Sequence, residues 1–203
     1  MKPVMNLMAK AKKIIILPSS FYNVPEFVSI LDERFVVFCR EANSYNYLLA
    51  QHTGAKIILD HDMAFRLQGR LHRCLLPPTW HLAKRMFTLK TQTARLHRSS
   101  VRLFRLDGES KHHYKTDYDL SDALGWFGPY EPRKNIDYAM KVMLNFVYPF
   151  QKIKTDRLHI AIAAALTGVD VQLYDNSYGK ISGVYRQTLS RLPNVIFQTE
   201  GEK

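Results

Sequence analysis

The stretch from residue 152 to residue 180, KIKTDRLHIAIAAALTGVDVQLYDNSYGK, holds the side chains best suited to chemistry. The pattern predicts a strand, a polar turn, an apolar helix and a second strand, which is half of an α/β unit. Its polar residues gather at the two turns: Asp156, Arg157, His159, Asp175, Asn176 and Lys180. In open α/β sheets, ligands bind at the carboxyl ends of strands, so both turns are predicted to face one cleft.

The helix between these turns has clear ends. Thr155 or Asp156 is predicted to cap its N-terminus, and Gly168 stands where a left-handed C-terminal cap is needed. The run from Ile160 to Leu166 has no polar face, which predicts a helix buried in a core. Its positively polarised N-terminus favours an anion beside Arg157 and His159. Taken singly, these residues also fit a cap, a buried histidine or a surface lysine.

The first 65 residues predict a parallel half-domain. The expected strands are Ile14–Leu17, Arg34–Cys39 and Ile57–Leu59, and the expected helices are Pro25–Leu31 and Ser44–Gln51. Ser20 follows the first strand, where its hydroxyl could bind a substrate or only form a turn. Arg40 and Glu41 follow the second strand. The guanidinium of Arg40 offers paired donors for a carboxylate or phosphate. An ion pair with Glu41 or Asp62 is the open alternative.

A basic segment follows this half-domain. Residues 63–105 contain ten Lys or Arg and no Asp or Glu, within a chain of formal net charge +11. Trp80, Phe87 and several leucines are interspersed, which indicates one or two basic amphipathic helices. A nucleic acid, an anionic membrane surface or the phosphates of a lipid-linked substrate would each fit this charge. The chain lacks the sequence signatures of nucleic-acid modules, which argues against nucleic acid.

The remaining chain completes a second α/β unit. The expected elements are a strand at Val101–Leu106, a helix at Asn135–Phe150, a last helix from a Ser182 cap to Leu192, and a strand at Val195–Phe197. No segment is a membrane span or a signal peptide, so we expect a cytoplasmic protein. Cys39 and Cys74 have no metal-type spacing and are expected to be free thiols; no metal site is predicted.

The motifs TDRLH and YDNSYGK, separated by an apolar helix and a Gly-hydrophobic step, resemble the C-terminal signature of the polysaccharide pyruvyl transferases. These enzymes move an enolpyruvyl unit from phosphoenolpyruvate onto a sugar. IIILPSSF and FCREANSYNYL followed by IILDHDMAF are weaker echoes of the same family. Family members usually open with a Gly-rich strand-to-helix turn, and nothing before Lys12 supplies it. The N-terminal lobe is therefore expected to be truncated.

The resemblance implies an α/β fold with two Rossmann-like lobes in a glycosyltransferase-B-like layout and the site between them. The expected divisions are a partial N-terminal lobe at 1–65, a basic connector at 66–100 and a C-terminal lobe at 101–203. Phosphoenolpyruvate, the donor substrate, is expected between Arg40 and the turn of Arg157 and His159, with no separate cofactor. Further substrate-binding residues are expected as follows: Ser20, Glu41, Ser44, Asp156, Asn176 and Lys180.

On this interpretation His159 is the acid that protonates the methylene carbon, and Lys180 neutralises the leaving phosphate. The acceptor is a saccharide, either free or carried on a lipid at the inner membrane face. Two alternatives remain open at this point. A nucleotide-sugar glycosyltransferase shares the two-lobed layout, and a non-catalytic relic would bind its donor or a partner without turnover.

Overall fold

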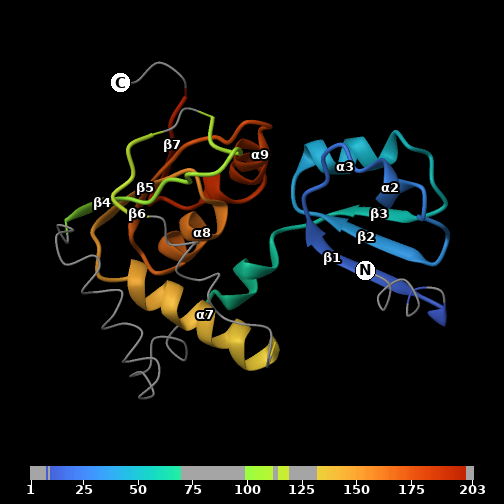
Figure 1. Cartoon of the computed structure of the whole chain (residues 1–203), viewed down its shortest axis with the longest axis horizontal. Helices are drawn as coiled ribbons and strands as arrows, with labels where there is room; N and C mark the ends of the chain where they lie inside the picture. The colour runs from blue at the N-terminus through green and yellow to red at the C-terminus, as the bar shows by residue number, and fades with distance from the viewer. Residues whose placement is uncertain (1–7, 9, 70–98, 112–113, 119–131, 200–203) are drawn as a thin grey trace.

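The computed structural model describes residues 8, 10–69, 99–111, 114–118 and 132–199. It has the predicted α/β fold, with two separate parallel sheets and helices beside them (Figure 1). Residues 70–98, which make up most of the predicted basic connector, lie outside the described residues, and so do Trp80, Phe87 and Cys74.

The first lobe contains a three-stranded sheet in the order β1-β2-β3: β1 Ile14–Ser19, β2 Phe35–Cys39 and β3 Lys56–Leu59. The connecting helices are α2 (Pro25–Val28) and α3 (Ala42–Leu49). All pairings are parallel, so the carboxyl ends of the strands lie at one edge of the sheet. Phe35, Val37 and Cys39 are buried on the side that packs against the helices, which makes β2 the centre of this core.

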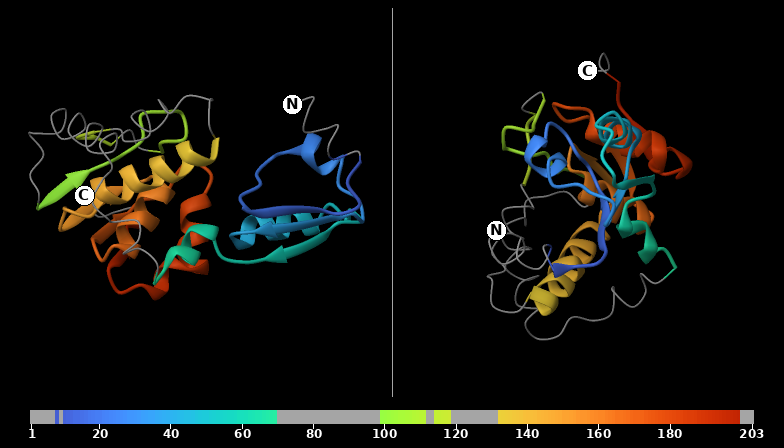
Figure 2. Two further views of the ribbon diagram at one scale, coloured as in Figure 1. Left: turned by 90° about the horizontal axis from the view of Figure 1, so that it is seen from below. Right: turned by 90° about the vertical axis from the view of Figure 1, so that its right-hand side faces the viewer.

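The second lobe contains a four-stranded parallel sheet in the order β4-β5-β6-β7, seen beside the first lobe in Figure 2. Its strands are β4 Ser100–Arg102, β5 Lys152–Thr155, β6 Asp170–Leu173 and β7 Val195–Phe197. The helices are α7 Pro132–Val147, α8 Leu158–Leu166 and α9 Lys180–Gln187, and the 3-10 turn η2 spans Leu189–Arg191.

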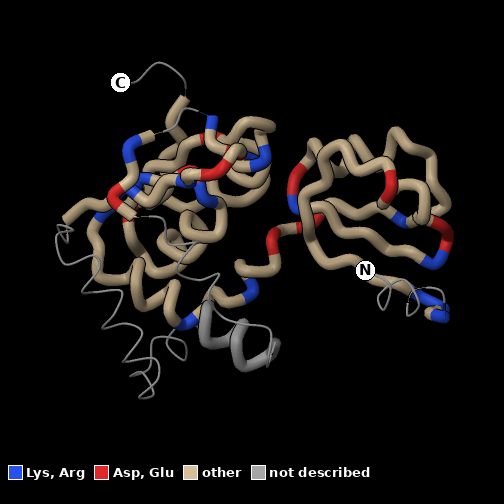
Figure 3. Tube along the Cα trace, in the orientation of Figure 1, with Lys and Arg blue, Asp and Glu red and all other residues tan. Residues whose placement is uncertain are grey.

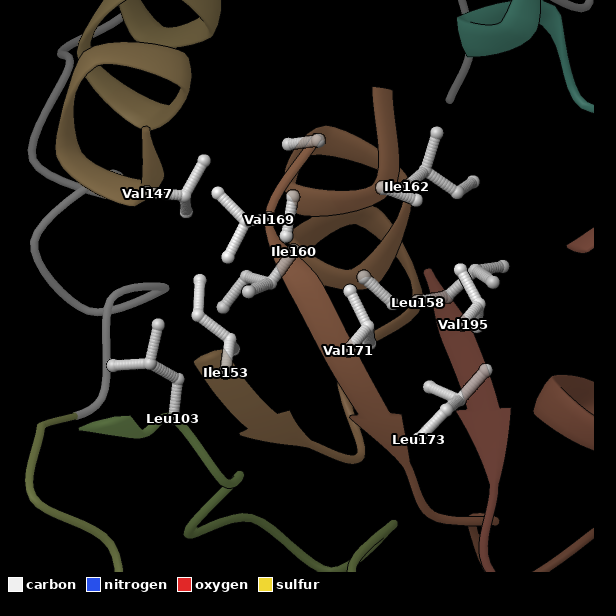
Figure 4. Close-up of a cluster of buried hydrophobic side chains, with 14 of the residues drawn as sticks. Leu103, Val147, Ile153, Leu158, Ile160, Ile162, Val169, Val171, Leu173 and Val195 are labelled. Atoms are coloured by element: carbon white, nitrogen blue, oxygen red, sulfur yellow. The ribbon is translucent and has the colours of Figure 1, made fainter. Parts of the chain in front are cut away.

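Helix α8 lies in the core of this lobe, as its lack of a polar face predicts. Ile160 is directed toward Ile153 of β5, whereas Ile162 lies on the opposite side of the helix (Figure 4), and both side chains are buried in the same core. Gly168 ends the helix with φ 80°, and Val169 N–H donates to the carbonyl of Ala164. This Schellman arrangement confirms the predicted left-handed cap.

Several predicted boundaries need correction. The strand expected at Val101–Leu106 ends at Arg102, because the chain then turns to place Arg105 N–H on the carboxylate of Asp156. Neither Asp156 nor Thr155 caps α8: the N-cap residue is Arg157, which makes no side-chain cap bond, and its N–H donates to Thr155 Oγ1. Ser182 is not the cap of the last helix either. That helix begins at Lys180, whose N–H bonds the side chain of Asn176.

The segment between the lobes is part of both. Asp62 follows β3 and caps the 3-10 helix η1 (Met63–Leu67) by accepting from Ala64 N–H at 2.9 Å. Ala64 and Phe65 then pack against the core of the second lobe. The expected division at residue 65 thus falls inside an element that already belongs to the second lobe.

Candidate functional site

Arg40 stands where the carboxyl ends of the first sheet meet. Its Nε donates to Ser20 Oγ at 2.8 Å, and its Nη1 donates to Asp62 Oδ2 at 2.6 Å. The ion pair is well enclosed, with side chains of Arg40 and Asp62 13% and 7% exposed. Within the described chain, Nη2 has no hydrogen-bond partner, so one edge of the guanidinium can still receive an anion.

His159, in the first turn of α8, faces Arg40 from the other lobe. Its Nε2 lies 3.5 Å from Arg40 Nη1, although 119 residues separate the two in sequence. His159 is exposed, but the protein around it displaces part of its hydration. This desolvation is the main cause that lowers the pKa of His159; Asp62 opposes the shift, and the charges of Arg40 and Lys180 add to it. The free protein therefore holds His159 as a neutral imidazole at neutral pH.

Arg157 and Lys180 are held by acidic residues of the segment after β4. In this segment the basic residue Arg105 is followed by two acidic residues, Asp107 and Glu109; Figure 3 colours Lys and Arg blue and Asp and Glu red. Arg157 Nη1 lies 3.9 Å from Asp107 Oδ2, and Lys180 Nζ lies 3.2 Å from Glu109 Oε2. Both cations are largely enclosed, with side chains 12% and 15% exposed. The predicted anion-binding cations thus lie against carboxylates of a single segment.

Electrostatics keep these carboxylates ionised. The hydrogen bond from Arg105 lowers the pKa of Asp107. Burial raises the pKa of Glu109, but the charges of Lys180 and Arg105 outweigh it, and the net shift is downward. Asp156 differs, because its burial raises its pKa despite bonds from Arg105 N–H and Ser110 Oγ. It has no exposed surface and holds the acidic segment in place.

The other predicted binding residues are mostly buried supports. Glu41 is 2% exposed, and its carboxylate accepts from the backbone and the hydroxyl of Ser44. Ser44 Oγ in turn accepts from Phe21 N–H at 2.6 Å, which fixes the turn after β1. Asn176 is 1% exposed and positions α9 through its bond to Lys180 N–H. Glu41 and Ser44 nevertheless line a small pocket together with Ser20 and Lys180.

The structure thus brings Ser20, Arg40, His159 and Lys180 together between the lobes. The sequence offered Glu41 and Asp62 as alternative ion-pair partners of Arg40. In the structure the partner is Asp62. It did not single out Tyr22, Asn43 or Tyr178, which also line the pocket. Tyr178 was visible inside the YDNSYGK motif, whereas Tyr22 and Asn43 carried no signal of their own.

In the part of the chain that the structure describes, no helix has the length and apolarity to cross a membrane. Among the same residues, no group of three or more His, Cys, Asp or Glu is arranged to hold a metal ion. The thiol of Cys39 is buried, which raises its pKa to about 12 and keeps it protonated.

No protein-family model matches the chain, and no curated protein does. Among solved structures, it is similar to the crystal structure of an uncharacterized protein from Klebsiella pneumoniae, with a TM-score of 0.70 and 29% sequence identity. The match covers 98% of this chain and 68% of that chain. The likeness extends across both lobes and supports the α/β fold.

Proposed function

We propose that this chain binds phosphoenolpyruvate between its lobes and transfers the enolpyruvyl unit to a saccharide, forming a pyruvate ketal. The observation that carries the proposal is the approach of Arg40 to His159 at 3.5 Å from opposite lobes. Arg40 is a cation that can bind the carboxylate of the donor. His159, beside it, has an imidazole that can transfer a proton to the bound donor. Lys180 lies close enough to influence the same imidazole.

The reaction joins two sugar hydroxyls to C2 of the donor. A proton adds to C3, which turns the methylene into a methyl group, and one hydroxyl oxygen attacks C2. The C2–O bond to phosphate then breaks, and the second hydroxyl closes the ketal. Of the two hydroxyl protons, one balances the proton taken up at C3 and the other leaves with phosphate. The protein must therefore bind two anionic groups and supply one proton near C3.

Arg40 and Arg157 are assigned to the donor's anionic groups. Arg40 offers the Nη2 edge, which has no partner among the described residues, and a planar guanidinium matches a carboxylate or phosphate with two parallel donors. Arg157 lies directly before α8, whose N-terminus favours negative charge. Lys180 is assigned to the departing phosphate. Asp107 and Glu109 hold Arg157 and Lys180 in position before the donor arrives.

His159 is assigned the proton transfer. In the free protein its lowered pKa keeps it neutral, so it cannot yet act as an acid. A bound carboxylate and phosphate would counter the charges of Arg40 and Lys180, which raises the pKa and favours imidazolium. Donor binding therefore favours protonation of His159, which can then donate the proton to C3. Positioned acid catalysis contributes typically about 10²- to 10⁴-fold to a rate.

The basic residues of 63–105 are assigned to the acceptor. A lipid-linked saccharide would bring its diphosphate near the basic residues of 63–105, and the protein would work in the cytoplasm as a peripheral partner of the inner membrane face. Residues 70–98 lie outside the described residues, and the charge of the sequence supports this assignment.

Titration calorimetry with phosphoenolpyruvate tests the donor site. Arg157→Ala should weaken binding by about ten- to hundredfold, because one charge-assisted anchor contributes about 1.5–3 kcal/mol. Arg102→Ala is the matched control, since Arg102 pairs with Asp117 in the same lobe and its side chain is 40% exposed. Arg40→Lys keeps the charge but loses the guanidinium fork, and should also weaken binding. Unchanged affinity in Arg157→Ala and Arg40→Lys would refute the donor site.

A further inference from the structure

Two tyrosines from different lobes stack where the lobes meet. Tyr22 follows β1 and Tyr178 precedes α9, and their ring centroids are 5.2 Å apart with the planes inclined by 21°. Tyr178 is fixed through its hydroxyl, which donates to Glu109 Oε2 at 3.1 Å and lies 2.7 Å from Lys180 Nζ. Tyr22 is 67% exposed despite the stack. Most of one aromatic ring is therefore left open at the junction.

A small pocket lies beside this pair. Besides the two tyrosines it is lined by Ser20, Phe21, Glu41, Asn43, Ser44 and Lys180. Its volume of about 20 Å³ is enough for one water molecule or one hydroxyl group. A sugar ring does not fit inside, but a ring lying across the mouth could place one hydroxyl within it.

We propose that Tyr22, Tyr178 and Asn43 form a saccharide-binding subsite, with the sugar ring lying on the exposed ring of Tyr22. A pyranose has an apolar C–H face and a rim of hydroxyls. The negative face of an aromatic ring attracts the C–H face. Asn43 is exposed, and its amide has no hydrogen-bond partner in the described parts of the chain, so it can donate and accept at the rim.

The charges of the site favour a neutral ligand over a nucleotide. The pocket contains the carboxylate of Glu41 as well as the ammonium of Lys180, and Lys180 also pairs with Glu109. On the pocket side of Lys180, a diphosphate would lie against the carboxylate of Glu41. A polyol needs no such cation, because hydroxyls bond to carboxylate, amide and ammonium alike.

The position of the subsite suits an acceptor, an assignment that rests on the proposed transfer reaction. Two pocket residues also belong to the proposed donor site: Ser20 bonds Arg40 Nε at 2.8 Å, and Lys180 lies near His159. A sugar held on Tyr22 would thus have its hydroxyls directed toward the donor. Tyr22 and Asn43 would act as specificity-determining residues, because they contact the sugar and not the reacting carbon.

Saturation-transfer NMR with methyl glycosides of glucose, galactose and mannose tests this subsite on the full chain. At least one glycoside should bind the parent protein. Tyr22→Ala should weaken that binding by about two- to tenfold, the usual worth of a well-placed aromatic contact. Tyr22→Phe should retain it. Tyr148→Ala is the matched control, because Tyr148 is 56% exposed after α7 and lies outside the pocket lining.

Calorimetry with phosphoenolpyruvate on the same proteins separates the two proposals. Loss of glycoside binding in Tyr22→Ala with intact donor binding supports both. If glycosides depend on Tyr22 while phosphoenolpyruvate binds no variant, the saccharide subsite stands and the transfer reaction fails. If no glycoside binds the parent, or Tyr22→Ala binds as tightly as the parent, the subsite is overturned. Uridine or uridine diphosphate binding that depends on Tyr22 would also overturn it in favour of a nucleotide site.

Discussion

Asp62→Asn should destabilise the protein and yet strengthen its binding of phosphoenolpyruvate. Asp62 uses its two oxygens separately: Oδ1 accepts from Ala64 N–H, and Oδ2 accepts from Arg40 Nη1. Asparagine can keep the first bond, but then its amide group faces the guanidinium as a second donor. Because the two side chains are only 7% and 13% exposed, solvent compensates little for the lost bond. We expect a loss of about 1.5–3 kcal/mol in the free energy of unfolding.

The gain in donor affinity follows from the same geometry. Removing the Asp62 carboxylate frees Nη1 of Arg40 and removes a negative charge close to the proposed donor carboxylate. The control is Asp117→Asn, which breaks the exposed pair of Asp117 with Arg102, with side chains 23% and 40% exposed. Such a pair contributes about 0–1 kcal/mol.

Urea unfolding measures the stability of both variants, and calorimetry measures their donor affinity. The reasoning predicts that Asp62→Asn costs clearly more stability than Asp117→Asn and binds phosphoenolpyruvate more tightly than the parent. An equal cost in the two variants would show that enclosure does not strengthen the Arg40–Asp62 pair. Weaker donor binding in Asp62→Asn would mean that the carboxylate orients Arg40 for the donor and does not compete with it.

Two further predictions concern the junction and the histidine. Gly183→Ala should lower the melting temperature, because an added Cβ would lie 3.0 Å from the Cβ of Glu41 in the other lobe. Overpacking costs about 1–3 kcal/mol, and the middle of that range exceeds the roughly 1 kcal/mol of helix propensity gained. Gly108→Ala, with no atom within 4 Å of the added Cβ, should leave the melting temperature nearly unchanged, and equal shifts in both variants would contradict the tight contact. Because desolvation lowers the pKa of His159 below its ordinary 6.5, the unfolded chain binds a proton that the native chain does not, so stability should fall as pH drops below 6.5. His159→Gln should flatten that part of the stability profile measured by urea unfolding, and an unchanged slope would contradict the lowered pKa.

The sequence was most informative where one local rule decides the structure. The apolar run of α8 has to be buried on all sides, and Gly168 alone can adopt a left-handed cap without strain, so both features were predictable. The ends of β2, β3 and β7 could be located in the same way, because their apolar runs stop at polar turns, whereas the end of β4 could not. The predicted cap at Asp156 was wrong because the distant Arg105 N–H bonds to its carboxylate. The predicted cap at Ser182 was wrong because α9 begins at Lys180, so Ser182 lies inside the helix and its N–H donates to Asp175 Oδ1.

The site between the lobes depends on packing that no local pattern encodes. Arg40 has Glu41 beside it in sequence, but the parallel order of β2 and β3 brings Asp62 to it instead. His159 and Arg40 approach each other only because the two lobes pack together. The sequence pattern of each lobe does not predict how the lobes are oriented relative to one another. The pairing of Lys180 with Glu109 likewise depends on how the segment after β4 folds back.

Proton uptake on donor binding tests the central claim most directly. Phosphoenolpyruvate is titrated at about pH 7 into the parent and into His159→Gln, each in two buffers with different ionisation enthalpies. The difference in heat between buffers gives the number of protons taken up, and the subtraction of one protein from the other cancels the protons of the donor itself. We predict that the parent takes up more protons than His159→Gln while both bind the donor. Equal proton counts in the two proteins, or no binding to the parent, would contradict a donor site built on Arg40 and His159.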